Sequence, residues 1–181
     1  MPRKVVSLVV ALLGLGSLTL AGCGYALAGR GSFLPERIRV IGVPIFTNQT
    51  PYFDLEQVFT EKVRSELIGR GRYTILPESV GVDAVLTGLI RSLNLSPSSF
   101  TDDQQASRYV ATITASLELR DVVNDEVLWE NPSLRFREEF DAATGADAND
   151  PNAFFDQGTN ALERLSTEFA RTVVGTILEA F

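Results

Sequence analysis

Cys23 is the residue in this sequence whose surroundings point most clearly to covalent chemistry. It ends the run Leu20-Ala21-Gly22-Cys23, which follows two basic residues and an apolar stretch from Val5 to Leu20. So short an apolar run with small residues at its exit is typical of a cleaved secretory signal. An aliphatic residue, two small residues and a cysteine match the bacterial lipobox, in which the thiol is alkylated by a lipid. We therefore expect residues 1–22 to be a signal peptide and Cys23 to carry a covalent lipid.

The lipid on Cys23 would decide where the protein works. Each buried methylene contributes about 0.8 kcal/mol, so the two or three acyl chains of a lipoprotein anchor it stably. Gly24 stands where an aspartate commonly signals retention at the inner membrane, which favours the outer membrane. Residues 23–36 form a short tether, and the chain from Cys23 to Ile38 reaches at most about 50 Å. We expect a lipid-anchored protein on the periplasmic side of the outer membrane.

The composition excludes several kinds of chemistry. The sequence has no histidine and one cysteine, which removes histidine-based catalysis, thiolate metal sites and redox pairs. The net charge of −7 becomes −9 when Arg3 and Lys4 leave with the signal peptide, and an acidic domain is a poor general binder of nucleic acid. No phosphate-binding or dinucleotide motif is present. We expect no enzyme, no cofactor other than the lipid and no nucleic-acid partner.

Arginines supply the remaining polar candidates for a site. A guanidinium group matches phosphate bidentately, so arginines gathered near one end of a sheet would suit the phosphates of an anionic lipid. The alternative is a solvated strand face on which they pair with Glu118, Glu138 and Glu139. Carboxylates in this region would also permit a glycosidase pair, but glutamates on strands are more often surface charge. The candidate arginines are Arg91, Arg108, Arg120, Arg135 and Arg137.

An aromatic candidate lies in the segment 96–107. Phe100 stands alone there among polar neighbours, so it is a candidate for insertion into a partner. Segments 96–107 and 141–152 are long for loops of a compact domain, which favours binding loops or disorder. Tyr25, Phe33 and Phe53 could also contact a partner, although packing against the local core is the simpler expectation.

The elements that position these residues are indicated by hydrophobic periodicity. A stripe of Leu55, Phe59, Val63 and Leu67 predicts an amphipathic helix, with Asp54 and Gln57 resembling a capping box. Strict alternation over 109–120 predicts a strand with one buried face. Asn131-Pro132 predicts a bulge or break in the strand that follows. Together the patterns predict strands over 38–46, 72–76, 84–95, 109–120 and 126–140, and helices over about 54–68 and from about 150 to the C-terminus.

This order predicts an α+β two-layer sandwich in a single domain over residues 37–181. Each helix has one apolar stripe, so the two helices should pack side by side on one face of a mixed β-sheet of about four to five strands. The other face of the sheet should be partly polar.

Read together, the sequence resembles the LptE family of lipopolysaccharide-assembly lipoproteins. The likeness extends over nearly the whole chain after the signal peptide and rests on the order and spacing of short motifs rather than on one specific motif. These are Cys23-Gly24-Tyr25, Leu27, Gly29, Leu34-Pro35, Ile38, Ile41, Val43, Pro44, Phe46, Asn48, Thr50, Leu55-Glu56, Asp83-Ala84-Val85-Leu86-Thr87-Gly88, Arg108-Tyr109 and Leu128-Trp129.

The resemblance implies a function that periodicity alone does not indicate. Members of this family sit as a plug inside the large outer-membrane β-barrel LptD, help to assemble it and assist delivery of lipopolysaccharide to the outer leaflet, without catalysis. The five arginines and Phe100 then become candidate contacts with lipopolysaccharide or the barrel. A second interpretation is a periplasmic lipoprotein module that regulates a peptidoglycan synthase. Such a module typically needs a longer disordered arm than residues 23–36 provide.

Overall fold

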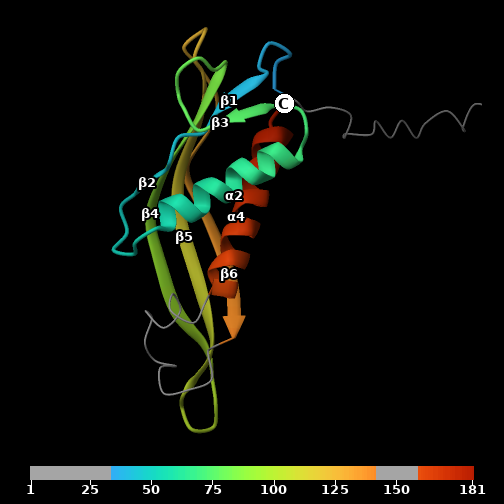
Figure 1. Cartoon of the computed structure of the whole chain (residues 1–181). Coiled ribbons are helices and arrows are strands. Elements are labelled where there is room, and N and C mark those ends of the chain that lie inside the picture. The colour runs from blue at the N-terminus through green and yellow to red at the C-terminus, as the bar shows by residue number, and fades with distance from the viewer. Residues whose placement is uncertain (1–33, 142–158) are drawn as a thin grey trace, which may run out of the picture. The chain divides into compact units, whose positions relative to one another are not determined.

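A computed structural model describes residues 34–141 and 159–181 (Figure 1). The predicted signal peptide, Cys23, most of the tether, and the segment in which the last helix was expected to begin lie outside the described residues. The elements are β1 (Val40–Gly42), β2 (Thr47–Asn48), α2 (Leu55–Gly69), β3 (Thr74–Leu76), β4 (Ala84–Phe100), β5 (Ala106–Asp121), β6 (Glu126–Asp141) and α4 (Thr159–Glu179).

The six strands form one mixed sheet in the order β3-β1-β4-β5-β6, with β2 also paired to β4. Strands β4, β5 and β6 form a long antiparallel meander. The short strand β1 runs parallel to both β3 and β4. The predicted α+β class with a mixed sheet is confirmed, and the short β2 adds one strand to the predicted number.

Strand β5 explains how the sheet is divided into two unlike faces. Its odd-numbered side chains from Ala111 to Leu119 are buried, whereas the even-numbered ones between them are only partly buried. Successive side chains on a strand point to opposite faces, so this alternation marks one covered face and one open face. The predicted period-two strand is confirmed.

The covered face lies beneath both helices, which pack against each other on the same side of the sheet (Figure 1). The predicted stripe of α2 is buried, and α4 buries Leu165, Phe169, Val173 and Ile177. Phe169 joins the layers, since its ring meets Phe59 of α2 edge-on at 5.0 Å and Phe136 of β6 at 6.4 Å between centroids. The expectation of two helices on one face is therefore confirmed.

A close contact between Phe46 and Gly88 fixes the segment that leads into α2. The buried ring of Phe46 lies directly on Gly88 of β4, where an added Cβ would come within 2.7 Å of two ring carbons. The Phe46 N–H donates to Thr60 Oγ1 of α2 at 2.9 Å. Only a glycine at position 88 leaves room for this ring.

Two local predictions near α2 are wrong. The apolar run 38–46 is not one strand, because residues 43–46 separate β1 from β2 and Pro44 lies within this break. Asp54 does not form a capping box: its backbone is left-handed (φ 63°) and its side chain makes no cap hydrogen bond. Outside β1 the run is apolar because Ile38, Val43 and Phe46 are buried, not because they pair in the sheet, and periodicity cannot separate the two causes.

The predicted loop 96–107 is also wrong in large part. β4 continues to Phe100 and β5 begins at Ala106, so that only residues 101–105 turn the chain. Ser and Pro are unusual in a central strand. Beyond Ile90, however, β4 has no strand on its other side among the described residues, and Pro97 is tolerated at such an edge. The predicted break at Asn131-Pro132 is confirmed by a register shift between β5 and β6.

Candidate partner-binding surfaces

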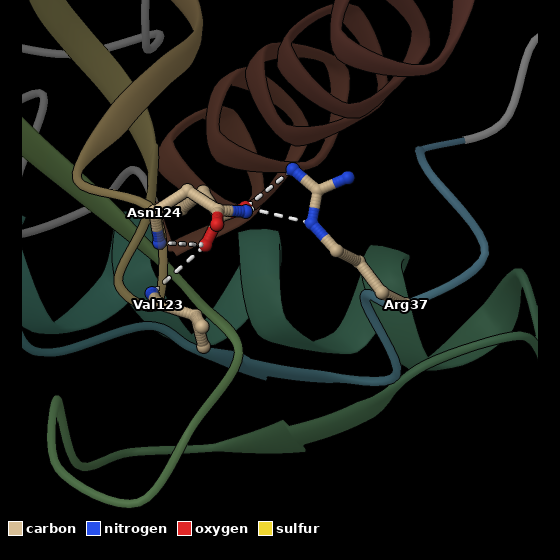
Figure 2. A network of polar contacts seen from close by, with 4 residues as sticks. Arg37, Val123 and Asn124 are labelled. Atoms are coloured by element: carbon tan, nitrogen blue, oxygen red, sulfur yellow. Dashed lines mark hydrogen bonds and ion pairs between the residues drawn. The ribbon is translucent and has the colours of Figure 1, made fainter.

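A buried carboxylate, Asp121, ends the covered face of β5. Three residues that donate hydrogen bonds to it, Arg37, Val123 and Asn124, are labelled in Figure 2. Asp121 continues the alternation of buried residues along β5, and Ala84 of β4 lies opposite it in the sheet. Its oxygens accept hydrogen bonds from Arg37 Nε at 2.9 Å, from the backbone N–H groups of Val123 at 2.8 Å and Asn124 at 3.0 Å, and from Asn124 Nδ2 at 2.8 Å. Arg37 therefore ties the segment before β1 to the turn between β5 and β6.

These hydrogen bonds keep Asp121 ionised. The backbone N–H of Asn124 contributes most, and with Arg37 and the other donors it lowers the pKa of Asp121 from 3.8 to about 2, although burial acts in the opposite direction. A second carboxylate, Asp83, accepts the backbone N–H groups of Arg39 and Val40 at 2.8 Å each, which lowers its pKa as well.

The Asp121 network fixes the end of the sheet at which the chain enters the domain. The turn between β4 and β5 lies at the opposite end of β5, a strand of 16 residues that spans roughly 50 Å at about 3.3 Å per residue. Sequence reasoning missed Asp121. The available signal was its position, because a carboxylate in phase with five buried residues is expected to be buried too.

The open face of the sheet carries two of the candidate arginines. Arg137 of β6 lies opposite Thr112 of β5, and Arg135 of β6 lies opposite Thr114 of β5. Directly paired residues of antiparallel strands share a face. Ser92 and Asn94 of β4 continue the same two rows. We call the residues Ser92, Asn94, Thr112, Thr114, Arg135 and Arg137 the polar strip.

The two arginines of the polar strip differ from Arg108 and Arg120 in their partners. Among the described residues Arg135 and Arg137 have no ion-pair partner, so they are not neutralised by Glu118, Glu138 or Glu139. Both are exposed. Guanidinium groups in a row with hydroxyl and amide side chains suit a ligand that presents both phosphate and hydroxyl oxygens.

The expectation that the arginines gather near one end of the sheet is wrong. Arg120 lies eight residues along β5 from the Thr112 row, or about 27 Å, and pairs with Glu118 at 2.9 Å and Asp125 at 3.0 Å. Arg108 lies at the other end and pairs with Asp141 at 3.1 Å. The exposed Arg91 occupies a bulge of β4 next to Ser92, so it lies beside the polar strip. The pairing register, which sequence does not give, decides this arrangement.

Phe100 lies at the far end of β4, immediately before the turn 101–105, and is 63% exposed. Tyr109 of β5 and Phe140 of β6 stack nearby along the hairpin with ring centroids 5.9 Å apart. The hairpin formed by β4, β5 and the turn 101–105 therefore carries the exposed ring of Phe100 near its tip and the stacked Tyr109–Phe140 pair further from it. Whether Phe100 or the arginines touch a partner stays a prediction.

The described part of the chain offers neither a metal-binding cluster nor a membrane-spanning helix. Residues 34–141 and 159–181 contain no group of three His, Cys, Asp or Glu side chains that would hold a metal ion. No helix in the same ranges is long and apolar enough to cross a membrane.

The comparisons with known proteins agree with this architecture. Among solved structures, the chain is similar to the hypothetical protein CT253 from Chlamydia trachomatis, with a TM-score of 0.51, 11% identity, and 78% of this chain and 96% of that chain covered. It is similar to a variant of PelC, a dodecamer from Paraburkholderia phytofirmans, with a TM-score of 0.50, 18% identity, and 84% of this chain and 96% of that chain covered. It is also similar to XCC0632 from Xanthomonas campestris, with a TM-score of 0.50, 15% identity, and 79% of this chain and 85% of that chain covered. At these identities the likeness concerns the fold alone. No curated protein matches the sequence.

The fold therefore places the protein in a class of small α+β domains in which two helices cover one face of a mixed sheet. The family assignment comes from the sequence itself. A family model described as lipopolysaccharide-assembly, LptE, matches residues 38–177. The chain belongs to the LptE family, a family of non-catalytic lipoproteins, as its motifs predicted.

Proposed function

We propose that this protein is an outer-membrane lipoprotein, anchored on the periplasmic side through a lipid on Cys23, that plugs an LptD-like β-barrel and helps to insert lipopolysaccharide into the outer leaflet. The match of the LptE family model to residues 38–177 is the observation that carries the proposal. The role requires binding surfaces and no bond-making step.

Two structural features support a plug. The domain presents a covered core beneath α2 and α4 and an open sheet face whose central polar strip is available for contact. The Asp121 network holds the segment before β1 against the turn between β5 and β6. We further propose that Arg135 and Arg137 contact lipopolysaccharide phosphates.

The central test is gentle detergent extraction of the tagged full-length protein from its own outer membrane, followed by identification of the copurifying proteins. A stoichiometric large β-barrel that resists high salt is the expected result. A peptidoglycan synthase in its place would favour the alternative role as a regulatory module, and the absence of any barrel would refute the plug.

The lipid anchor and the arginines have separate tests. Cys23→Ser should remove the acyl mass from the N-terminus in mass spectrometry, and an unchanged lipidated N-terminus would show that Cys23 is not the anchor. The double variant Arg135→Ala, Arg137→Ala should weaken binding of purified lipopolysaccharide. Arg164→Ala, an exposed arginine of α4, is the matched control. Equal binding by both variants would remove the polar strip from the proposal.

A further inference from the structure

The segment 47–54, which comprises β2 and the turn into α2 and is here called the Asn48 loop, is held by the side chain of Asn48. The Nδ2 group donates to the Tyr52 carbonyl at 2.7 Å and to Glu56 Oε2 at 2.8 Å. The Oδ1 atom accepts from the N–H of Thr50 at 2.9 Å and from its hydroxyl at 2.8 Å. All four hydrogen-bonding positions of the amide are thus used.

Further bonds fix the loop at both ends. The Thr50 hydroxyl also accepts the N–H of Tyr52 at 3.2 Å. The N–H of Gln49 donates to the Ile90 carbonyl of β4 at 2.9 Å. At the other end Asp54 adopts a left-handed backbone (φ 63°), which Asp tolerates better than most residues, and leads directly into α2. The loop is therefore rigid where it is attached to both the sheet and the helix.

This rigid loop presents Phe53 to solvent. Phe53 is 90% exposed, the highest value among large apolar side chains in the described ranges, so the expectation that it packs against the local core is wrong. A single exposed apolar residue needs no explanation by itself. An aromatic ring held outward by a fully bonded loop, however, loses little conformational freedom when it is buried by a partner, and such residues are frequent binding hot spots.

The charges around Phe53 indicate which kind of partner fits. Asp54 is exposed next to it, Glu56 follows on the first turn of α2, and no Lys or Arg occurs from Val40 to Glu61. Anionic membrane surfaces attract segments rich in Lys and Arg, so this loop is unsuited to them. A protein pocket with an apolar floor and a basic rim complements both the ring and its acidic neighbours.

We infer that Phe53 on the Asn48 loop inserts into an apolar pocket with a basic rim on the barrel that the protein plugs. This inference rests on the proposed function and adds to it an anchor residue and the chemistry of its receptor pocket. It assigns a role to the Asn48-Gln49-Thr50 segment, which the polar strip and the hairpin tip leave unexplained.

The test measures the affinity of the full-length protein for the purified barrel in detergent. Phe53→Ala should lose at least about tenfold in affinity, whereas Val80→Ala, which truncates a side chain that is 84% exposed on another loop, should bind as the wild type does. Asp54→Asn keeps a residue suited to the left-handed backbone and should weaken binding at low salt but not at high salt. Phe53→Ala should keep the wild-type unfolding midpoint.

Each outcome decides between the two proposals. Equal affinity of Phe53→Ala and wild type overturns the inference and leaves the plug intact. A lowered unfolding midpoint in Phe53→Ala also overturns it, because the ring would then be part of the core. Failure of the wild type to bind the barrel refutes the proposed function, and the inference falls with it.

Discussion

The contact between Phe46 and Gly88 makes a quantitative prediction for Gly88→Ala. The new Cβ would lie 2.7 Å from two carbons of the Phe46 ring, a separation at which real Cβ atoms essentially never occur. The ring cannot move freely, because Phe46 is 3% exposed and its N–H is bonded to Thr60 of α2. Overpacking of this kind costs about 1–3 kcal/mol.

An opposing effect reduces that cost. Replacing glycine by alanine restricts the unfolded chain and stabilises a protein by about 0.4–1 kcal/mol where the backbone permits it. The net loss in the free energy of unfolding should therefore be about 1–2 kcal/mol, and the unfolding midpoint should fall by roughly 2–8 °C. Gly175→Ala is the control: nothing lies within 4 Å of its added Cβ, so it should stabilise α4 by up to about 1 kcal/mol.

The assay is urea unfolding followed by the fluorescence of the single tryptophan, Trp129, in a double-mutant cycle. Phe46→Ala removes the ring, so that Gly88→Ala should stabilise by about 0.4–1 kcal/mol in that background, giving a coupling equal to the overpacking cost of about 1–3 kcal/mol. Wild-type stability for Gly88→Ala, or the same cost with and without the Phe46 ring, would refute the packing argument.

Three further predictions concern the core, the polar network and the hairpin. Phe169→Ala should cost about 3–5 kcal/mol in urea unfolding, because it removes a ring that contacts both Phe59 and Phe136, and a loss below about 1 kcal/mol would contradict that packing. The pKa of Asp121 is about 2 in the folded protein and 3.8 ordinarily, so its stabilisation is present above about pH 4 and is lost as the pH falls through 2. The stability difference between wild type and Asp121→Asn should therefore shrink between about pH 5 and pH 2, and a difference independent of pH would argue against the network as its source. Replacing Ser96–Ser107 by a short Gly-Ser turn should leave the domain folded by circular dichroism, because most of this segment is exposed, and should weaken copurification of the barrel; unchanged copurification would exclude the hairpin tip from the interface.

The parts of the fold that the sequence predicts well are those with one covered face. The alternation in β5 and the stripes of α2 and α4 are visible because the helices bury one side of each element while solvent reaches the other. Among residues 34–141 and 159–181 no helix packs on the hairpin end of β4, and Ser96–Ser99 lack the apolar residues that mark a strand. In 38–46 the reverse holds: Val43 and Phe46 are buried although the chain has left the sheet there.

The candidate surfaces were harder to predict because they depend on register. Thr112 and Arg137 share a row only through the pairing of β5 with β6, and a bulge at Asn131-Pro132 shifts that pairing along the strand. Because the register is not known from the sequence, the distance between Arg120 and Arg135 along the sheet was not predicted either. The exposure of Phe53 was not predicted for another reason: it depends on the hydrogen bonds of Asn48, and a hydrophobicity pattern carries no information about side-chain hydrogen bonds.

The break in β6 has a consequence for self-association. β6 is the last strand of the sheet, and no described strand pairs with its outer edge, which is a template for joining another copy. Pro132 supplies no N–H there, the adjacent register shift bends the strand, and charged side chains from Glu130 to Asp141 resist close stacking. The edge is thus protected against the pairing with further copies of the chain that would lead to fibril growth.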